Sequence, residues 1–131
     1  MVDPEAVSET IESLLETPAD DALAVVADPE ATTLEDEQLL DVLGRRHALA
    51  VLEAVVTADG GVRFSELERA LSASPSTLSA RLSTLVEVGL LERTTYDEVP
   101  PRVEYGSTEA GAALAPLFAY LSLWESRYGL E

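Results

Sequence analysis

The apolar and polar positions between residues 64 and 105 predict two short helices followed by two strands. The first helix is expected over residues 64–71 (FSELERAL), and the turn SAS at residues 72–74 separates it from the second. Ser65 and Glu68 have the spacing of a capping box, in which each side chain accepts a hydrogen bond from the backbone N–H of the other. This spacing predicts a capped N-terminus for the first helix.

The second helix is expected to begin at Ser74-Pro75 and to end at Gly89. Serine is a good N-cap, and proline at the first helical position lacks only an N–H group that has no partner within the helix. Glycine tolerates the left-handed conformation that follows a helix C-terminus. The spacing i, i+4, i+7 predicts one buried face on this helix. Its members are Leu78, Leu82 and Leu85.

Two short strands are expected after this helix, over residues 90–96 and 102–105, joined by a tip that contains Pro100 and Pro101. Helix, turn, helix and β-ribbon in this order make a winged helix-turn-helix, whose second helix fits the major groove of DNA. The expected fold class is therefore mainly α with a small β-hairpin wing.

Helical spacing also precedes this segment. Helices are expected over residues 34–43 and 45–57, followed by a clear stop at Ala58-Asp59-Gly60-Gly61. The pair Val62-Arg63 is expected to form a strand of one or two residues. Arg45 and Arg46 would then stand at the start of a helix, where the helix dipole disfavours positive charge. A phosphate or the acidic N-terminal segment could account for them, and the sequence does not choose between these.

A long C-terminal helix is expected from Ser107 onward, with a bend or a break at Pro116. Its apolar stripe is wider than a terminal helix of a single small domain needs, so we interpret the stripe as a dimer interface or core. A ligand pocket between the terminal helices is the alternative. The stripe consists of Leu114, Leu117, Phe118, Leu121, Trp124 and Tyr128.

Residues 1–33 are interpreted as an acidic, partly helical extension, and residues 34–131 as the winged helix-turn-helix domain with its C-terminal helix. One amphipathic helix and a shorter one are expected in the extension. They could pack on the domain or on a second subunit, or the extension could be a partly disordered, solvating segment. The apolar positions are Val7, Ile11, Leu14 and Leu15 for the first helix, and Leu23, Val25 and Val26 for the second.

The charge of this 131-residue chain is unusual, because it carries 25 acidic and eight basic residues and has a formal net charge of −17. All eight basic residues are arginine, and seven of them lie within residues 45–102. Such a composition is similar to that of proteins from extreme halophiles that accumulate salt, and an acidic mesophilic protein is the alternative. A binder of nucleic acid usually has a basic face. Concentrated salt weakens that requirement, because the counterion-release contribution to affinity falls as salt rises.

Several function classes are excluded or disfavoured. The chain has no cysteine, so disulfides, thiolate catalysis and Cys-ligated zinc are excluded. Its apolar runs are too short to span a membrane, and the N-terminus lacks the basic region of a secretory signal, so a cytoplasmic location is expected. No motif of an enzyme or a cofactor site stands out. His47 is the only histidine and is interpreted as a partly buried structural residue, not a metal ligand.

The face of the second helix opposite its leucines is small and hydroxyl-rich. No acidic residue occurs between Pro75 and Val86. Hydroxyl side chains can bond to phosphates or base edges, and an alanine methyl can contact thymine. The alternative is a plain solvated face. The candidate DNA contacts on this helix are Ser76, Thr77, Ser79, Ala80, Arg81 and Ser83, with Thr84 at the margin.

Arg81 is the only basic residue of that helix, and it is interpreted as a phosphate or guanine contact, with an intramolecular ion pair as the alternative. Arg102, after two prolines that stiffen the turn, is a candidate for a minor-groove or backbone contact. Arg93 and Arg63 could touch phosphates or could be surface charges of the strands.

Five sequence blocks, in this order and spacing, resemble the HxlR-type winged-helix transcriptional regulators. The blocks are LGRRHAL at 43–49, RFSEL at 63–67, LSARL at 78–82, GLLER at 89–93 and YDEVPPRVEY at 96–105. The resemblance covers roughly Leu39 to Tyr128 and implies a homodimer that binds a palindromic or near-palindromic operator in double-stranded DNA. It implies one recognition helix per subunit in the major groove, wings on the flanking DNA, and dimerisation through the terminal helices.

The chain departs from the pattern of these regulators at two points. The family usually has Gly-Lys-Trp where this chain has Arg45-Arg46-His47. Many members carry a redox-active cysteine near the N-terminus, and its absence here excludes sensing by a thiol of the chain. A small-molecule effector remains open. A winged-helix module that binds proteins and not DNA is the alternative function.

Overall fold

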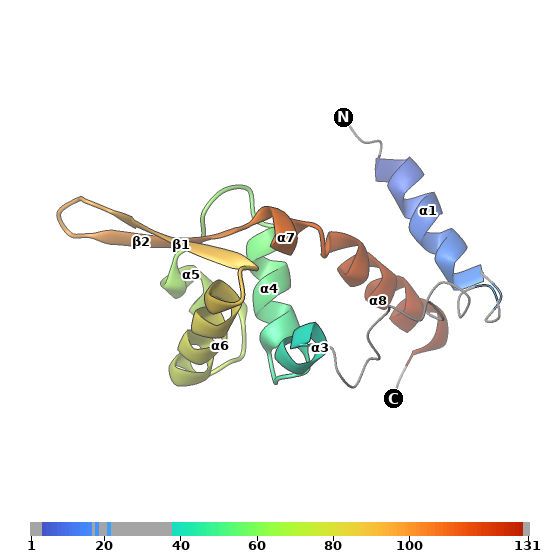
Figure 1. Cartoon of the computed structure of the whole chain (residues 1–131), viewed down its shortest axis with the longest axis horizontal. Helices are drawn as coiled ribbons and strands as arrows, with labels where there is room; N and C mark the ends of the chain where they lie inside the picture. Colours follow the sequence, from blue (N-terminus) through green and yellow to red (C-terminus); the bar gives the residue numbers. More distant parts are fainter. Residues whose placement is uncertain (1–3, 17, 19–20, 22–37, 130–131) are drawn as a thin grey trace. The chain divides into compact units, whose positions relative to one another are not determined.

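The computed structural model describes residues 4–16, 18, 21 and 38–129 of the chain. The chain packs as two compact units, one made of residues 1–36 and 116–131 and the other of residues 37–115. Its elements, in order, are α1 (Pro4–Glu16), α3 (Gln38–Leu43), α4 (Ala48–Val56), α5 (Phe64–Ala70), α6 (Pro75–Glu87), β1 (Leu91–Tyr96), β2 (Arg102–Ser107), α7 (Glu109–Ala112) and α8 (Ala115–Tyr128) (Figure 1). The mainly helical fold with one β-hairpin confirms the predicted fold class.

The core of the second unit forms where α6 meets α4, α5 and β1. Leu78, Leu82 and Leu85 are completely buried, which confirms the predicted core face of α6. The other large side chains that are fully buried are Val51, Leu52 and Val55 of α4, Leu67 of α5 and Leu91 of β1. Burial of each such side chain contributes about 1.5–3 kcal/mol to folding. The apolar face therefore fixes which side of α6 remains available to a partner.

Both ends of α6 are capped as the sequence predicts. At the N-terminus, the Ser74 hydroxyl accepts a hydrogen bond from the Thr77 backbone N–H at 3.2 Å. At the C-terminus, Gly89 has a φ of +85°, a conformation that glycine adopts without steric cost. The backbone N–H groups of Leu90 and Gly89 donate to the carbonyls of Leu85 and Val86. These two bonds form a Schellman motif, which turns the chain from α6 into β1.

The predicted start of α5 at Phe64 is confirmed, but the predicted capping box is wrong. The carboxylate of Glu66 accepts a hydrogen bond from the backbone N–H of Arg63 at 3.0 Å, so the cap lies two residues earlier than the expected Ser65 and Glu68 pair. Val62 forms a bridge with Tyr105 of β2, and this bridge extends the chain up to Arg63. The helix therefore begins at Phe64, with Ser65 already inside its first turn.

The helix expected over residues 45–57 begins later, at Ala48. Arg45, Arg46 and His47 form a turn between α3 and α4, and His47 has a φ of +68°. A non-glycine residue in this region interrupts regular helix geometry, so the two arginines do not stand in the first turn of a helix. The conflict with the helix dipole that the sequence suggested is therefore absent.

The wing is an antiparallel pair in which Leu91 lies opposite Ser107 and Tyr96 lies opposite Arg102. Strand β2 runs two residues beyond the predicted end at residue 105, because Gly106 and Ser107 continue the pairing with β1. The C-terminal helix is divided, as Pro116 predicts, with a turn at residues 113–114 between α7 and α8.

Helix α7 is held tightly against the corner where α6 leads into β1. The Thr108 hydroxyl donates to the Gly89 carbonyl at 2.6 Å and accepts from the Gly111 N–H at 3.1 Å. A Cβ atom on Gly111 would collide with the carbonyl oxygen of Leu90. The close approach therefore requires glycine, and it anchors the end of the wing to the helical core.

The first unit contains α1 and most of α8. Ile11 of α1 and Phe118 of α8 are buried, and Arg127 lies 3.9 Å from Glu16 as an exposed ion pair. The helix predicted in the N-terminal extension is thus confirmed for Pro4–Glu16. The shorter helix predicted from Leu23, Val25 and Val26 lies outside the described residues, and the boundary at residues 33 and 34 stays a prediction. In the described part of the chain, no helix is long and apolar enough to cross a membrane.

Candidate nucleic-acid interface

The exposed face of α6 has the small, acid-free character that the sequence predicts. Ser76, Ser79, Ala80 and Ser83 are exposed, while Thr77 is partly buried. Thr77 also takes part in the N-terminal cap, because its hydroxyl accepts a hydrogen bond from the Ser74 hydroxyl at 2.9 Å. The remaining small side chains leave the helix backbone accessible to a large partner. A long acidic side chain at these positions would repel a negatively charged partner such as nucleic acid.

Arg81 lies at the edge of this face and is partly buried. Its Nε donates a hydrogen bond to the backbone carbonyl of Arg46 at 2.8 Å. The residue therefore ties the recognition helix α6 to the turn between α3 and α4. The sequence suggested an ion pair as the intramolecular alternative, but the observed partner is a carbonyl group.

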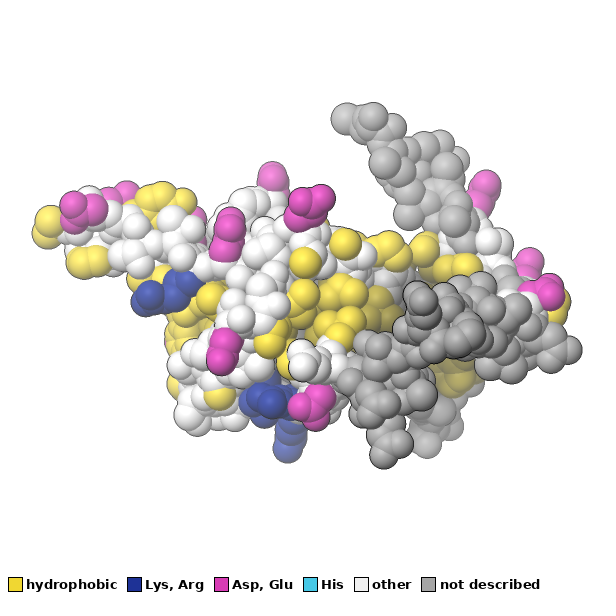
Figure 2. Space-filling model, in the orientation of Figure 1, with side chains coloured by type: hydrophobic (Ala, Val, Ile, Leu, Met, Phe, Trp, Pro, Cys, Tyr) yellow, Lys and Arg dark blue, Asp and Glu magenta, His cyan; other side chains and the backbone are white. Residues whose placement is uncertain are grey.

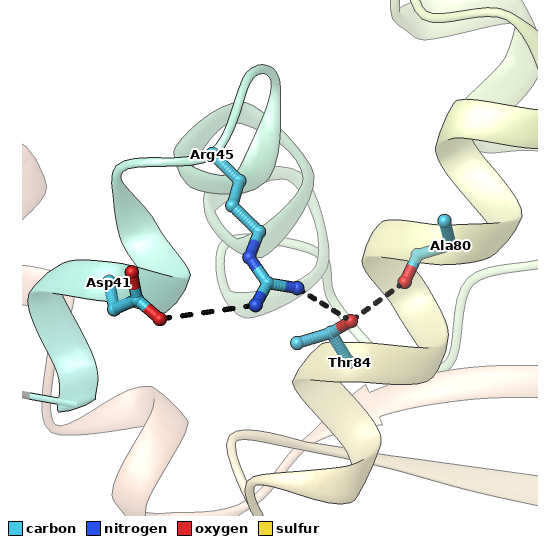
Figure 3. A network of polar contacts seen from close by, with 4 residues as sticks. All are labelled: Asp41, Arg45, Ala80 and Thr84. Atoms are coloured by element: carbon cyan, nitrogen blue, oxygen red, sulfur yellow. Dashed lines mark hydrogen bonds and ion pairs between the residues drawn. The ribbon is translucent and has the colours of Figure 1, made fainter.

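A second arginine, Arg45 in the same turn, also joins the turn to α6 (Figure 3). Arg45 donates to the Thr84 hydroxyl at 3.5 Å, and its guanidinium lies 4.0 Å from the carboxylate of Asp41. The Thr84 hydroxyl in turn donates to the Ala80 carbonyl at 3.0 Å. Sequence reasoning missed this network, because the three elements it joins meet only in the folded chain.

The side chain of Arg46, the residue after Arg45 in the same turn, is exposed. Figure 2 shows arginine side chains in two separate groups on the face that it draws, one just below the wing and one at the lower edge of the helices. His47 next to Arg46 is partly buried, in agreement with a structural role. Among the residues that the structure describes, no group of three metal-ligating side chains is present.

Arg102 is the first residue of β2 and is engaged within the wing. Its guanidinium lies 3.2 Å from a carboxylate oxygen of Glu98 and 3.3 Å from one of Glu104. It also stacks over the ring of Tyr96, with 4.2 Å to the ring centroid. The Nε of Arg102 makes no well-aligned hydrogen bond, so its attraction to Glu104 is mainly one of charge. Two carboxylates therefore compete with DNA for this arginine.

The opposite face of the wing carries a different set of side chains. Arg93 of β1 lies directly across from Tyr105 of β2, so both point to the same side of the hairpin. Together with α6 they line a groove of about 450 Å³. The groove is lined by Ser79, Ser83, Val86, Glu87, Arg93 and Tyr105. Tyr105 was not singled out from the sequence, because its position depends on the strand register.

The predicted interface residues of the C-terminal helix differ in exposure. Leu121 and Tyr128 are 45% and 58% exposed, which is high for large apolar side chains. Leu114, Leu117 and Trp124 are partly buried, and Phe118 is buried. The Trp124 and Tyr128 rings lie 5.2 Å apart. In α1, Leu14 is 50% exposed as well. The terminal helices α1 and α8 thus have apolar side chains that are exposed to solvent in the single chain.

These features define a class of protein. A helix-turn-helix with an acid-free recognition face, followed by a β-hairpin wing that shares a groove with it, is the arrangement of winged-helix DNA-binding proteins. The family of HxlR-like helix-turn-helix proteins matches residues 42–131. The chain belongs to this family, and it is a DNA-binding transcriptional regulator.

Individual relatives agree with this assignment. The chain is 36% identical over 93 residues to the HTH-type transcriptional regulator YvaP of Bacillus subtilis, covering 70% of this chain and 84% of YvaP. It is 40% identical over 89 residues to the HTH-type transcriptional regulator Mb3122 of Mycobacterium bovis, covering 68% of this chain and 55% of Mb3122.

A solved structure agrees as well. The reduced form of the transcriptional regulator YodB from B. subtilis superposes with a TM-score of 0.63 at 28% identity, covering 74% of this chain and 94% of YodB. This chain contains no cysteine, so it has no thiol that could be oxidised or reduced.

Proposed function

We propose that the chain acts as a homodimeric, sequence-specific regulator that places one recognition helix α6 per subunit in the major groove of its operator. The observation that carries the proposal is the exposed face of α6, which has no acidic side chain between Pro75 and Val86 in a chain of net charge −17. A merely solvated face has no reason to lack carboxylates in so acidic a protein. A surface that approaches DNA is expected to lack carboxylates, because a carboxylate there would face the negatively charged phosphates.

The residues proposed to contact DNA lie on two elements. On α6, exposed hydroxyls and a methyl group approach base edges or phosphates, and Arg81 lies at the margin. On the wing, Arg93 is exposed, while Arg102 first has to leave its two carboxylate partners. The proposed contacts are Ser76, Thr77, Ser79, Ala80, Arg81, Ser83, Arg93 and Arg102.

The dimer is proposed to form through the terminal helices. The open apolar side chains of α1 and α8 support this, because monomeric proteins seldom leave several large apolar side chains of one helix in water. The proposed interface residues are Leu114, Leu117, Phe118, Leu121, Trp124 and Tyr128. Two recognition helices related by a two-fold axis then read two half-sites, and this geometry predicts an operator with palindromic symmetry.

In vitro selection from a random pool of DNA duplexes tests the proposal. Selection is carried out in parallel from low to multimolar KCl, because the acidic composition points to a protein that tolerates concentrated salt. We expect one enriched motif with two-fold symmetry and half-sites about one helical turn apart. A chain that enriches no motif at any salt concentration is not a sequence-specific regulator, and the protein-binding module becomes the better interpretation.

A further inference from the structure

The groove between α6 and the wing has hydrogen-bond donors on both walls. We propose that it binds one phosphate of the DNA backbone, with Tyr105 and Arg93 on the wing and Ser79 and Ser83 on the helix as its donors. The inference rests on the proposed function and adds to it a contact residue, Tyr105, and a fixed position for the wing on the duplex.

The helix wall is made of serines one turn apart. Ser79 and Ser83 are neighbours on the surface of α6, because residues i and i+4 lie on the same side of a helix. Both are exposed and both line the groove. Their hydroxyl groups can donate to a phosphate oxygen, and their small size leaves the groove open.

The wing wall is a cross-strand pair. Arg93 and Tyr105 are directly opposite residues of β1 and β2, and the Cβ atoms of such a pair lie about 4.5–5.5 Å apart. The guanidinium of the first and the phenol of the second can therefore reach the same oxyanion. Hydrogen bonds from a charged donor to phosphate are the strong ones, and an arginine also matches the geometry of phosphate.

The backbone of Tyr105 is bonded to a segment outside the wing. Its backbone N–H and carbonyl both bond to Val62, each at 2.8 Å, while its other side pairs with Arg93. At this point one isolated bridge from Val62 joins the two-stranded wing. The backbone that carries the Tyr105 side chain is therefore fixed before DNA binds, which lowers the conformational cost of binding.

Arg93 is the wing arginine that remains available. Arg102 lies at the other end of β2 and pairs with Glu98 and Glu104, whereas Arg93 has no ion pair among the contacts of the described residues. Glu87 lines one end of the groove, one turn beyond Ser83. Its negative charge opposes a phosphate at that end. The phosphate is therefore expected near Ser79 and Ser83, on the side where α6 faces the major groove.

The test uses the duplex obtained by selection, labelled with fluorescein, and measures affinity by anisotropy over a series of KCl concentrations. We expect Arg93→Ala to weaken binding about tenfold, as for one hydrogen bond to a charged group. The slope of log affinity against log salt is expected to fall by about one, because one phosphate contact by a charged residue is lost. Tyr105→Phe removes a donor that carries no charge, so affinity is expected to fall roughly three- to tenfold with the slope unchanged.

Two further variants make the test specific. Glu87→Gln is expected to tighten binding roughly threefold, because a repelling charge is removed from the end of the groove. Arg127→Ala removes one positive charge from α8, outside the unit that contains the groove. It serves as the matched control with unchanged affinity, and light scattering checks that its mass equals that of the wild type, because α8 carries the proposed dimer interface. Ser83→Ala removes a donor of the helix wall at an exposed position and is expected to weaken binding roughly three- to tenfold.

The effects of Arg93→Ala and Tyr105→Phe are expected to be non-additive, because both residues bind the same phosphate. If the wild type binds the selected duplex but Arg93→Ala, Tyr105→Phe and Ser83→Ala leave affinity and salt slope unchanged, the groove does not hold a phosphate, and the proposed function still stands. If no duplex is selected at any salt concentration, the proposed function itself fails.

Discussion

The arginine side chains of this chain make different contacts, although the sequence does not distinguish them. Arg81 and Arg45 hold the turn between α3 and α4 against the recognition helix, Arg102 is occupied by Glu98 and Glu104, and Arg93 faces the groove. The structure describes all eight arginines, and only Arg45, Arg102 and Arg127 have a carboxylate within ion-pair distance. Partner geometry, and not residue type, therefore decides which positive charges remain for DNA.

Arg81 gives the first prediction, because it connects the recognition helix with the turn. Arg81→Ala is expected to weaken operator binding by about 1–3 kcal/mol while the dimer stays intact. Anisotropy titration and light scattering measure the two properties. Arg81→Lys keeps the charge but replaces the planar guanidinium whose Nε binds the Arg46 carbonyl, so it separates the role of the charge from that of the hydrogen bond. Unchanged affinity in Arg81→Ala would remove Arg81 from the interface.

At the scale of elements, the short segments after α6 depend on close backbone contacts. The Schellman motif at Gly89 starts the wing, the Val62 bridge fixes its outer side, and α7 closes on Leu90. None of these contacts involves a large apolar side chain. These backbone contacts, together with the buried Leu91 of β1, place the wing beside the recognition helix.

Gly111→Ala is predicted to destabilise the second unit by about 1–3 kcal/mol, because the added Cβ collides with the backbone of Leu90 and must displace α7. Thermal unfolding followed by circular dichroism measures the change. Gly106→Ala is the matched control, since a Cβ at this position of β2 has only ordinary contacts, the nearest at 3.8 Å. Equal midpoints for the two variants would show that α7 does not need the close approach.

At the scale of the whole molecule, exposed apolar side chains and net charge govern assembly and stability. The apolar side chains of the terminal helices are open to solvent in one chain, and the net charge of −17 creates self-repulsion in any compact state. A dimer doubles the number of charges in one particle. We therefore expect assembly and stability to respond to mutations of α8 and to salt.

Trp124→Glu is predicted to convert the dimer to a monomer, because it places a charge in the proposed apolar interface. Light scattering at several protein concentrations measures the mass. Ser126→Glu adds the same charge at an exposed position of α8 and is expected to leave the mass unchanged. A dimer that survives Trp124→Glu has its interface elsewhere.

Added KCl is predicted to stabilise the chain, because screening shortens the range of repulsion from about 10 Å at 0.1 M to about 3 Å at 1 M salt. Each kcal/mol of repulsion relieved raises the unfolding midpoint by roughly 3–6 °C for a chain of this size. Sorbitol at matched osmolality changes water activity without adding ions and serves as the control. A midpoint that falls with KCl would contradict the proposed adaptation to concentrated salt.

Local patterns were sufficient for much of the fold. The apolar spacing of Leu78, Leu82 and Leu85, the Ser74-Pro75 start and the Gly89 stop are properties of neighbouring residues, and each was confirmed. The cap of α5 was not predictable in the same way. Ser65 and Glu68 have good capping spacing, but the Val62 bridge to β2 extends the chain up to Arg63, so the helix starts before that box can form.

The sequence by itself determined the class of fold, the core face of α6 and the acid-free face opposite to it, because all three follow from residues within one helix or its flanks. Only the tertiary structure decided which arginines are occupied and which residues meet across the groove. Arg45 reaches Thr84 across 39 positions of the chain, and the pairing of Arg93 with Tyr105 depends on strand register. Such contacts depend on where distant segments pack. The pattern of polar and apolar residues in one segment does not determine which other segment lies beside it.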